Sequence, residues 1–178
     1  MRHSRYIALL LGMAMLLTGC QSGDSTEEQI TETVNVFQAL PLPDVYIEIP
    51  EGYEKKSSQF YQEYYTKDTA SIIVTQDTSQ PSYSSNRDFA TSALMQYKQT
   101  TKSLNYIGED WIESGIYNVY VLEFSYTVGE DVPEMTAYIG YLTNGYKMFI
   151  ITCSAESTDY PNHKNEFRQV LSSVRITE

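Results

Sequence analysis

The sequence has few of the residues that most often carry chemistry. It contains two cysteines and two histidines among 178 residues, and its nine glycines are scattered along the chain. No cluster of histidine and cysteine suits a zinc site. Neither a glycine-rich phosphate loop nor a G-x-S-x-G nucleophile motif occurs. These absences give no support to zinc, nucleotide or serine-hydrolase chemistry, so we assign no catalytic residue, metal or cofactor.

Positive charge is also scarce. Lys and Arg total 12 against 23 Asp and Glu, which gives a formal net charge of −11 at pH 7. Binding to nucleic acid depends on neutralising its phosphates with Lys and Arg, so we expect no nucleic-acid partner. Anionic lipid headgroups should repel the same acidic surface. Membrane attachment, if present, therefore has to come from something other than a basic patch.

The apolar run near the N-terminus is short. Ile7–Leu17 is almost wholly apolar, but a membrane-spanning helix needs about 20 residues. The run follows Arg2 and Arg5, and no acidic residue precedes it. A basic start, a short apolar middle and a small-residue cleavage site are typical of a secretory signal peptide. An uncleaved membrane anchor is the alternative, which the length of the run disfavours.

The four residues Leu17-Thr18-Gly19-Cys20 close this run and resemble the lipobox of bacterial lipoproteins. The resemblance implies that Cys20 receives a diacylglyceryl group and that the chain is cut just before it. The lipid on Cys20 would then hold the protein at the membrane, facing the extracytoplasmic side. The expected organisation is a signal peptide at 1–19, the lipidated cysteine with a flexible acidic tether at 20–41, and a single globular α/β domain at 42–178.

The second cysteine has two interpretations. If Cys20 carries lipid, only Cys153 remains, no intramolecular disulfide can form, and the domain has to rely on its hydrophobic core. Cys153 shares a predicted strand face with Phe149 and Ile151, where a free cysteine usually behaves as a small hydrophobe. The alternative is a nucleophile activated by His163, which we expect at an exposed helix start. We favour the hydrophobe.

Hydrophobic periodicity predicts a mixed order of elements. Alternating apolar residues or short apolar runs predict strands at 45–49, 60–65, 70–76, 106–111, 117–127, 135–141 and 147–155. Helical spacing predicts one helix at 86–103, opened by Ser85 and Asp88 as a capping pair, and a second one from Pro161 onward. Asn144-Gly145 is the signature of a tight hairpin, so the strands on either side of it should be antiparallel.

This pattern resembles the Mog1/PsbP-like superfamily over roughly Leu42 to Ile176. The resemblance rests on the order of elements and on the strand-Pro-Glu-Gly-Tyr opening at Ile47–Tyr53. It also rests on the segment from Asn144-Gly145-Tyr146 through Cys153-Ser154-Ala155 to Phe167 and Leu171. It implies an α+β fold, an α/β/α sandwich with a mostly antiparallel central sheet. Relatives include extrinsic photosystem II subunits, a Ran-GTPase-binding factor and bacterial lipoproteins without an assigned activity. No functional residue can be carried over, because no functional motif matches.

Two groups of residues are candidates for a recognition surface. The sixteen tyrosines are unusual, and most should fill half-buried strands, which suit an apolar ring with a polar tip. Tyr61 and Tyr117 are the exceptions that we expect on polar strand faces. Glu130, Asp131 and Glu134 crowd one predicted loop, where a weak divalent-cation site is the alternative to a solvated charged loop. We favour the solvated loop.

The sequence therefore favours a membrane-anchored lipoprotein that acts as a non-enzymatic binding or accessory module. Its partner would be an unidentified extracytoplasmic protein or a component of the cell wall. The alternative is a cell-envelope enzyme, such as a hydrolase acting on wall material. An enzyme needs a concave site where titratable groups converge, whereas a binding module needs only a suitable surface.

Overall fold

The computed structural model describes residues 45–77, 85–143 and 147–176. The predicted signal peptide at 1–19, Cys20 with the predicted tether at 20–41, and the predicted turn at Asn144-Gly145 lie outside the described residues. No helix within the described ranges is long and apolar enough to cross a membrane.

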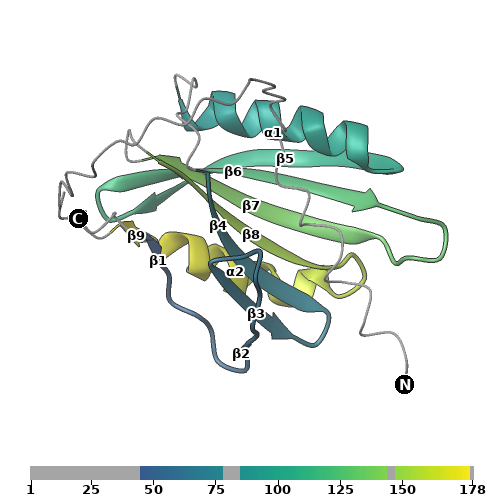
Figure 1. The fold of residues 1–178 in the computed structure, drawn as a ribbon, viewed down its shortest axis with the longest axis horizontal. Coiled ribbons are helices and arrows are strands. Elements are labelled where there is room, and N and C mark those ends of the chain that lie inside the picture. Colours follow the sequence, from purple (N-terminus) through teal and green to yellow (C-terminus); the bar gives the residue numbers. More distant parts are fainter. Residues whose placement is uncertain (1–44, 78–84, 144–146, 177–178) are drawn as a thin grey trace, which may run out of the picture. The chain divides into compact units, whose positions relative to one another are not determined.

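Seven strands form one sheet in which every neighbouring pair is antiparallel (Figure 1). Their order across the sheet is β2 (Glu54–Lys55), β3 (Glu63–Lys67), β4 (Ala70–Asp77), β8 (Met148–Glu156), β7 (Met135–Thr143), β6 (Tyr117–Thr127) and β5 (Ser103–Ser114). A separate antiparallel pair joins β1 (Val45–Tyr46) to β9 (Arg175–Ile176). The predicted antiparallel pairing of the strands on either side of Asn144-Gly145 is confirmed, because Thr143 on β7 pairs with Met148 on β8.

Helix α1 (Asn86–Thr100) covers one face of the sheet and helix α2 (Tyr160–Ser172) covers the other (Figure 1). Alternation along β6 creates both cores, since Val119 and Val121 face α2 while Tyr120 and Leu122 face α1. The α2-side core also contains Ile72, Val74, Tyr138, Phe149, Ile151, Cys153, Phe167, Val170, Leu171 and Val174. The α1-side core also contains Phe89, Ala90, Phe124, Tyr126, Met135, Ala137, Ile139, Tyr141 and Met148. The predicted three-layer arrangement is therefore confirmed.

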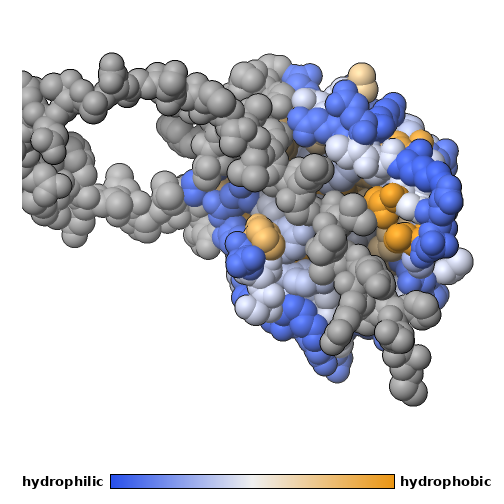
Figure 2. All heavy atoms as spheres, turned by 45° about the vertical axis from the view of Figure 1, so that its right-hand side comes forward, coloured by the Kyte–Doolittle hydropathy of each residue, from blue (hydrophilic) through white to orange (hydrophobic). Residues whose placement is uncertain are grey.

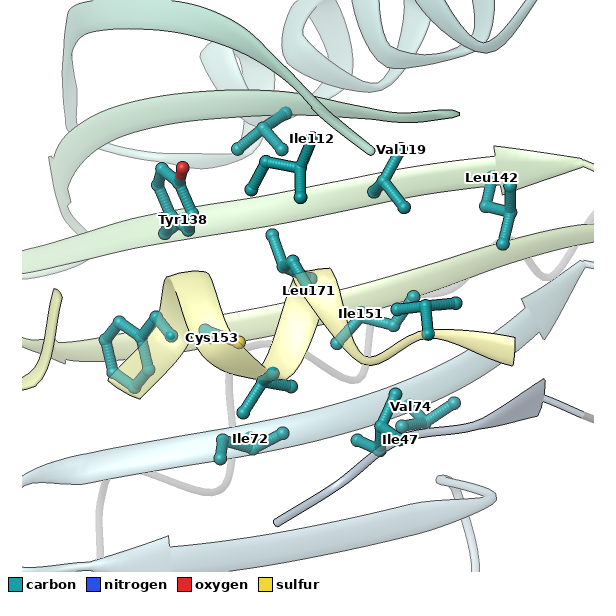
Figure 3. Packing of buried hydrophobic residues seen from close by; sticks show 14 of the residues in the cluster. Ile47, Ile72, Val74, Ile112, Val119, Tyr138, Leu142, Ile151, Cys153 and Leu171 are labelled. Atoms are coloured by element: carbon teal, nitrogen blue, oxygen red, sulfur yellow. The ribbon is translucent and has the colours of Figure 1, made fainter. Parts of the chain in front are cut away.

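Helix α2 docks on the sheet through an apolar stripe. Phe167, Val170 and Leu171 are completely buried, and so is Val174, which lies just beyond the end of the helix at Ser172. Figure 3 shows Leu171 over the sheet, among side chains that include Ile151. Burying an aliphatic or aromatic side chain of this kind contributes about 1.5–3 kcal/mol. The last helix is thus one of the two layers that cover the sheet.

Helix α1 begins where the capping pair predicts. The side chain of Ser85 accepts a hydrogen bond from the backbone N–H of Asp88 at 3.1 Å. The helix ends at Thr100 instead of continuing to Ser103 as predicted. Thr101 is extended, and the backbone N–H of Lys102 donates to the carbonyl of Thr127 at 2.8 Å. Pairing with β6 therefore ends the helix earlier than its apolar stripe suggests.

Two predicted strands are shorter than expected. Of 45–49, only Val45–Tyr46 is a strand, because its partner β9 is two residues long. Of 60–65, only the part from Glu63 onward is a strand. The hydroxyl of Ser58 accepts from the backbone N–H groups of Phe60 and Tyr61 at 3.1 and 3.2 Å. This local turn competes with strand pairing.

Candidate interaction surface

The structure places the two tyrosines singled out from the sequence on different sides of the sheet. Tyr61 precedes β3 instead of lying on a strand, is half-buried, and meets Tyr64 edge-on with ring centroids 5.8 Å apart. Tyr64 pairs with Ile73, whose neighbours Ile72 and Val74 face α2, so Tyr64 and the Tyr61 ring that contacts it lie on the α1 side. Tyr117 begins β6 and packs against the α2-side core. The two residues do not form one surface, and a recognition role for either stays a prediction.

The three carboxylates of the β6–β7 loop do not converge on a common point. The Lys102 ammonium donates to Glu130 at 2.7 Å, and Ser125 donates to Glu134 at 3.2 Å. No group of three or more His, Cys, Asp or Glu in the described part of the chain could hold a metal ion. Glu130, Asp131 and Glu134 are all exposed, and a recognition role for them stays a prediction.

Cys153 lies in the interior of the domain. Its side chain is fully buried in the α2-side core together with Phe149 and Ile151, as the strand pattern predicts (Figure 3). Burial raises the pKa of the thiol far above its ordinary value. A thiol that stays protonated and out of reach of solvent is a poor nucleophile, so Cys153 acts as a small hydrophobe.

His163 is buried, contrary to the exposed position expected from the sequence. Its side chain is 6% exposed and stacks on Phe167 with ring centroids 6.0 Å apart. Nδ1 lies 3.1 Å from Glu166 Oε2, and Nε2 lies 3.1 Å from Asp159 Oδ2. The expectation failed because His163 lies one helical turn before Phe167, on the face of α2 that packs against the sheet. Both ring nitrogens face carboxylates and not the thiol of Cys153, so the two residues form no nucleophilic pair.

The carboxylates around His163 are themselves held by other elements. Lys67 donates to Glu166 at 2.6 Å, and the Tyr53 hydroxyl donates to the same side chain at 3.3 Å. Thr69 donates to Asp159 at 2.7 Å. Hydrogen bonds from Asn162 and Thr69, with a smaller effect of His163, lower the pKa of Asp159 to about 2. These hydrogen bonds connect α2 to Tyr53, to Lys67 at the end of β3 and to Thr69 in the β3–β4 turn. The polar groups of the cluster thus bind one another.

The most exposed group of large apolar side chains follows β5 and the turn after it. We call Tyr106, Ile107, Trp111 and Ile116 the β5 patch; they are 44%, 49%, 51% and 88% exposed, respectively. On the face drawn in Figure 2, hydrophilic residues cover most of the described surface, and hydrophobic ones gather in a few places, most clearly at the right. Aromatic side chains are enriched at the centres of protein interfaces, which makes this patch the leading candidate for contact with a partner.

A β-bulge brings the two aromatic rings of the β5 patch to one face. Tyr106 pairs with Phe124 and Gly108 pairs with Glu123, so Ile107 is an extra residue with no partner on β6. Simple alternation would send Tyr106 and Trp111 to opposite faces. The extra residue, Ile107, shifts the alternation of side chains by one position after the bulge. Both rings therefore lie on the face that α1 covers further along the sheet.

Glu109 and Tyr120 orient the Trp111 ring of the β5 patch. Trp111 meets Tyr120 edge-on with ring centroids 4.8 Å apart. The Tyr120 hydroxyl donates to Glu109 at 2.5 Å, and Arg87 donates to the same carboxylate at 2.8 Å. The hydrogen bond from Tyr120 is the main cause that lowers the pKa of Glu109. The exposed Trp111 ring thus packs against a tyrosine whose hydroxyl is hydrogen-bonded to Glu109.

Our reading of the sequence missed the β5 patch, although the sequence contains a signal for it. Gly108 lies inside an otherwise strand-like segment, and a glycine in such a position often marks a bulge. The neighbouring Tyr106 and Ile107 are two consecutive large apolar residues in a strand whose face alternation changes at this point. Trp111, the single tryptophan, lies three residues after that glycine.

Comparisons with known proteins bear on the fold. No family profile matches the sequence, and no curated protein sequence matches it. Similar solved structures include cyanobacterial PsbP (CyanoP) of Synechocystis sp. PCC 6803, with a TM-score of 0.55 at 16% identity, over 76% of this chain and 92% of that one. LpqN of Mycobacterium tuberculosis, described as involved in cell envelope biogenesis, has a TM-score of 0.53 at 12% identity, over 76% and 84%. The Ran-binding protein Mog1p of Saccharomyces cerevisiae has a TM-score of 0.52 at 10% identity, over 74% and 89%. The chain therefore has the α+β, Mog1/PsbP-like fold that its sequence pattern predicts.

Proposed function

We propose that the protein is an extracytoplasmic lipoprotein, anchored through lipid on Cys20, whose domain acts as a non-enzymatic binding or accessory module. The observation that carries the anchor is the N-terminal order of Arg2 and Arg5, the short apolar run Ile7–Leu17, and Cys20 at its end. Two or more acyl chains give stable attachment where a single chain is marginal. A lipid anchor is also compatible with a surface too acidic to bind anionic headgroups by itself.

The structure supports a binding role more than an enzymatic one. Within 45–77, 85–143 and 147–176, Cys153 is buried and His163 is held between two carboxylates. The β5 patch, in contrast, exposes a tryptophan and a tyrosine. The solved structures with this fold include a Ran-binding protein and a protein involved in cell envelope biogenesis. None of these observations favours the alternative of a wall hydrolase.

Membrane fractionation of the full chain tests the anchor. Expressed in a bacterium with a C-terminal tag, the wild type should stay with the membranes after an alkaline wash and should incorporate a clickable fatty acid. Cys20→Ala should lose both properties, whereas Cys153→Ala, the matched control for removal of a cysteine, should keep them. Full retention of Cys20→Ala in the washed membranes would contradict the proposal.

A further inference from the structure

The two edges of the main sheet differ in how they are protected. The β2 edge is two residues long and fully exposed, and its Lys55 forms an ion pair with Glu63 at 2.9 Å. The β5 edge is 12 residues long, and no strand in the described part of the chain pairs with its outer side (Figure 1). Alternate residues of an edge strand leave their N–H and C=O groups unpaired. Natural proteins protect such an edge by shortening it, by placing charges such as lysine on it or by a β-bulge. Strand β5 is long and has no lysine, and its bulge at Ile107 leaves Gly108–Ser114 as a regular edge.

The charges on β5 select the kind of partner. The strand has no Lys or Arg and carries the carboxylates of Glu109, Asp110 and Glu113. Arg87 binds Glu109 at 2.8 Å, and Arg168 binds Asp110 at 2.7 Å. Glu113 is exposed and forms no ion pair with any described residue. A segment that lies along this edge therefore meets negative charge that is only partly compensated.

The same charges disfavour two other occupants. In a second copy paired edge to edge, the β5 carboxylates of the two chains would lie close together, and like charges facing each other destabilise a strand pair. The chain's own segment 21–43 contains four acidic residues and no Lys or Arg, so it is no better matched. A cationic segment from another molecule is the complementary occupant.

We propose that the outer edge of β5 binds an extended, basic peptide segment of an extracytoplasmic partner as an additional strand, with Trp111 and Tyr106 packing against its apolar side chains. Backbone hydrogen bonds to β5 supply affinity in this mode, and the flanking side chains supply specificity. Because the supports of Trp111 are already in place, little ordering is needed on binding, which lowers its entropic cost. The inference rests on the proposed binding role and names the surface and the partner chemistry.

The test uses the mature lipidated protein in detergent and fluorescent peptides of about ten residues in which lysine and valine alternate along one strand face and threonine fills the other. This arrangement matches β5, where Tyr106, Glu109, Trp111 and Glu113 share one face. The lysine–valine probe should bind more tightly than the same peptide with glutamate in place of lysine, and added salt should weaken the binding. Two further lysine–valine peptides carry backbone N-methyl groups on alternate residues, so that each peptide has the N–H groups of one edge blocked. If the peptide adds to β5 as a strand, blocking the edge that faces β5 should abolish binding, and blocking the other edge should leave it largely intact.

Variants locate the site. Trp111→Ala should weaken binding of the lysine–valine probe by about tenfold or more, as truncation of an aromatic hot spot does, and Glu113→Lys should weaken it as well. Phe60→Ala is the matched control, since Phe60 is 72% exposed but lies before β3, near the opposite edge of the sheet; its affinity should equal that of the wild type. Circular dichroism melts of all three variants confirm that they are folded.

Several outcomes would overturn the inference. They are equal binding of both N-methylated peptides, no preference for the basic probe, and unchanged affinity in a folded Trp111→Ala variant. A Trp111-dependent dimer in sedimentation would show that a second copy is the occupant. Membrane fractionation separates the two proposals, because failure of the wild type to bind the basic probe, with anchoring that still depends on Cys20, defeats only the inference about β5.

Discussion

The side chain of Leu171 on α2 lies directly against the backbone of Gly140 on β7. A Cβ atom at position 140 would come within 2.7 Å of Leu171 Cδ2 and within 2.8 Å of Val119 Cγ1. Tyr138 and Leu142, the neighbours of Gly140 on the same strand face, both have side chains in the α2-side core. The missing side chain at position 140 thus leaves the space into which Leu171 packs.

We expect Gly140→Ala to destabilise the domain by about 1–3 kcal/mol, because the added methyl group overpacks a dense core. Gly108→Ala is the control, since a Cβ there meets nothing within 4 Å. Urea denaturation of both variants measures the difference. If the clash with Leu171 is the cause, adding Leu171→Ala to Gly140→Ala should cost less than the two single changes added together. Equal stability of the two glycine variants would contradict this view of the packing.

The buried stripe of α2 should matter more for stability than for partner capture. Phe167→Ala and Leu171→Ala should each cost about 2–5 kcal/mol, through lost transfer energy and the cavity left behind. Since single domains have about 5–15 kcal/mol in total, removing both side chains should nearly unfold the protein. Phe60→Ala, an exposed aromatic control, should stay within about 0.5 kcal/mol of the wild type. Thermal melts that leave Phe167→Ala and Leu171→Ala unchanged would make α2 a docking arm instead of a core layer.

The thiol of Cys153 should react only when the domain opens. Burial removes the side chain from solvent and raises its pKa, so the reactive thiolate is scarce at about pH 8 in the folded state. Labelling of the Cys20→Ala variant with a chromogenic thiol reagent should be slow in buffer and fast in concentrated urea. Rapid labelling of the native protein would show that the thiol is accessible and would reopen a chemical role for it.

Asp159 should make the domain acid-sensitive. Its pKa in the folded state is about 2, below the ordinary value of about 3.9 for an unfolded chain. Because the folded pKa is depressed, its stabilising effect is fully present above about pH 4 and is lost as the pH falls toward 2. Melting temperatures of the wild type and of Asp159→Asn, measured from about pH 5 to pH 2, should therefore converge at the acidic end. Parallel profiles would mean that the hydrogen bonds from Asn162 and Thr69 do not lower this pKa.

The β5 patch could be read from the sequence only in part. A strand near 106–111 follows from the local pattern, and Gly108 hints at an irregularity. Which residues reach one face depends on the bulge, and the bulge exists only in register with Phe124 and Glu123 on β6. Tyr61 was misplaced for a related reason, since the hydroxyl of Ser58 takes up its backbone N–H before the strand begins.

The order of the two helices and of seven of the nine described strands follows from the sequence alone, whereas the two-residue strands β2 and β9 were not predicted. Side-chain periodicity is local, so β6 at Tyr117–Thr127 matches the prediction at both ends, and Ser85 with Asp88 marks the start of α1. Contacts between distant segments decided the rest. Examples are the pairing of β1 with β9, the burial of His163 between carboxylates tied to Lys67 and Thr69, and the fit of Leu171 over Gly140. Periodicity shows which side of an element is apolar. It does not show which distant residue packs against that side, because this depends on how all the elements are arranged in the folded chain.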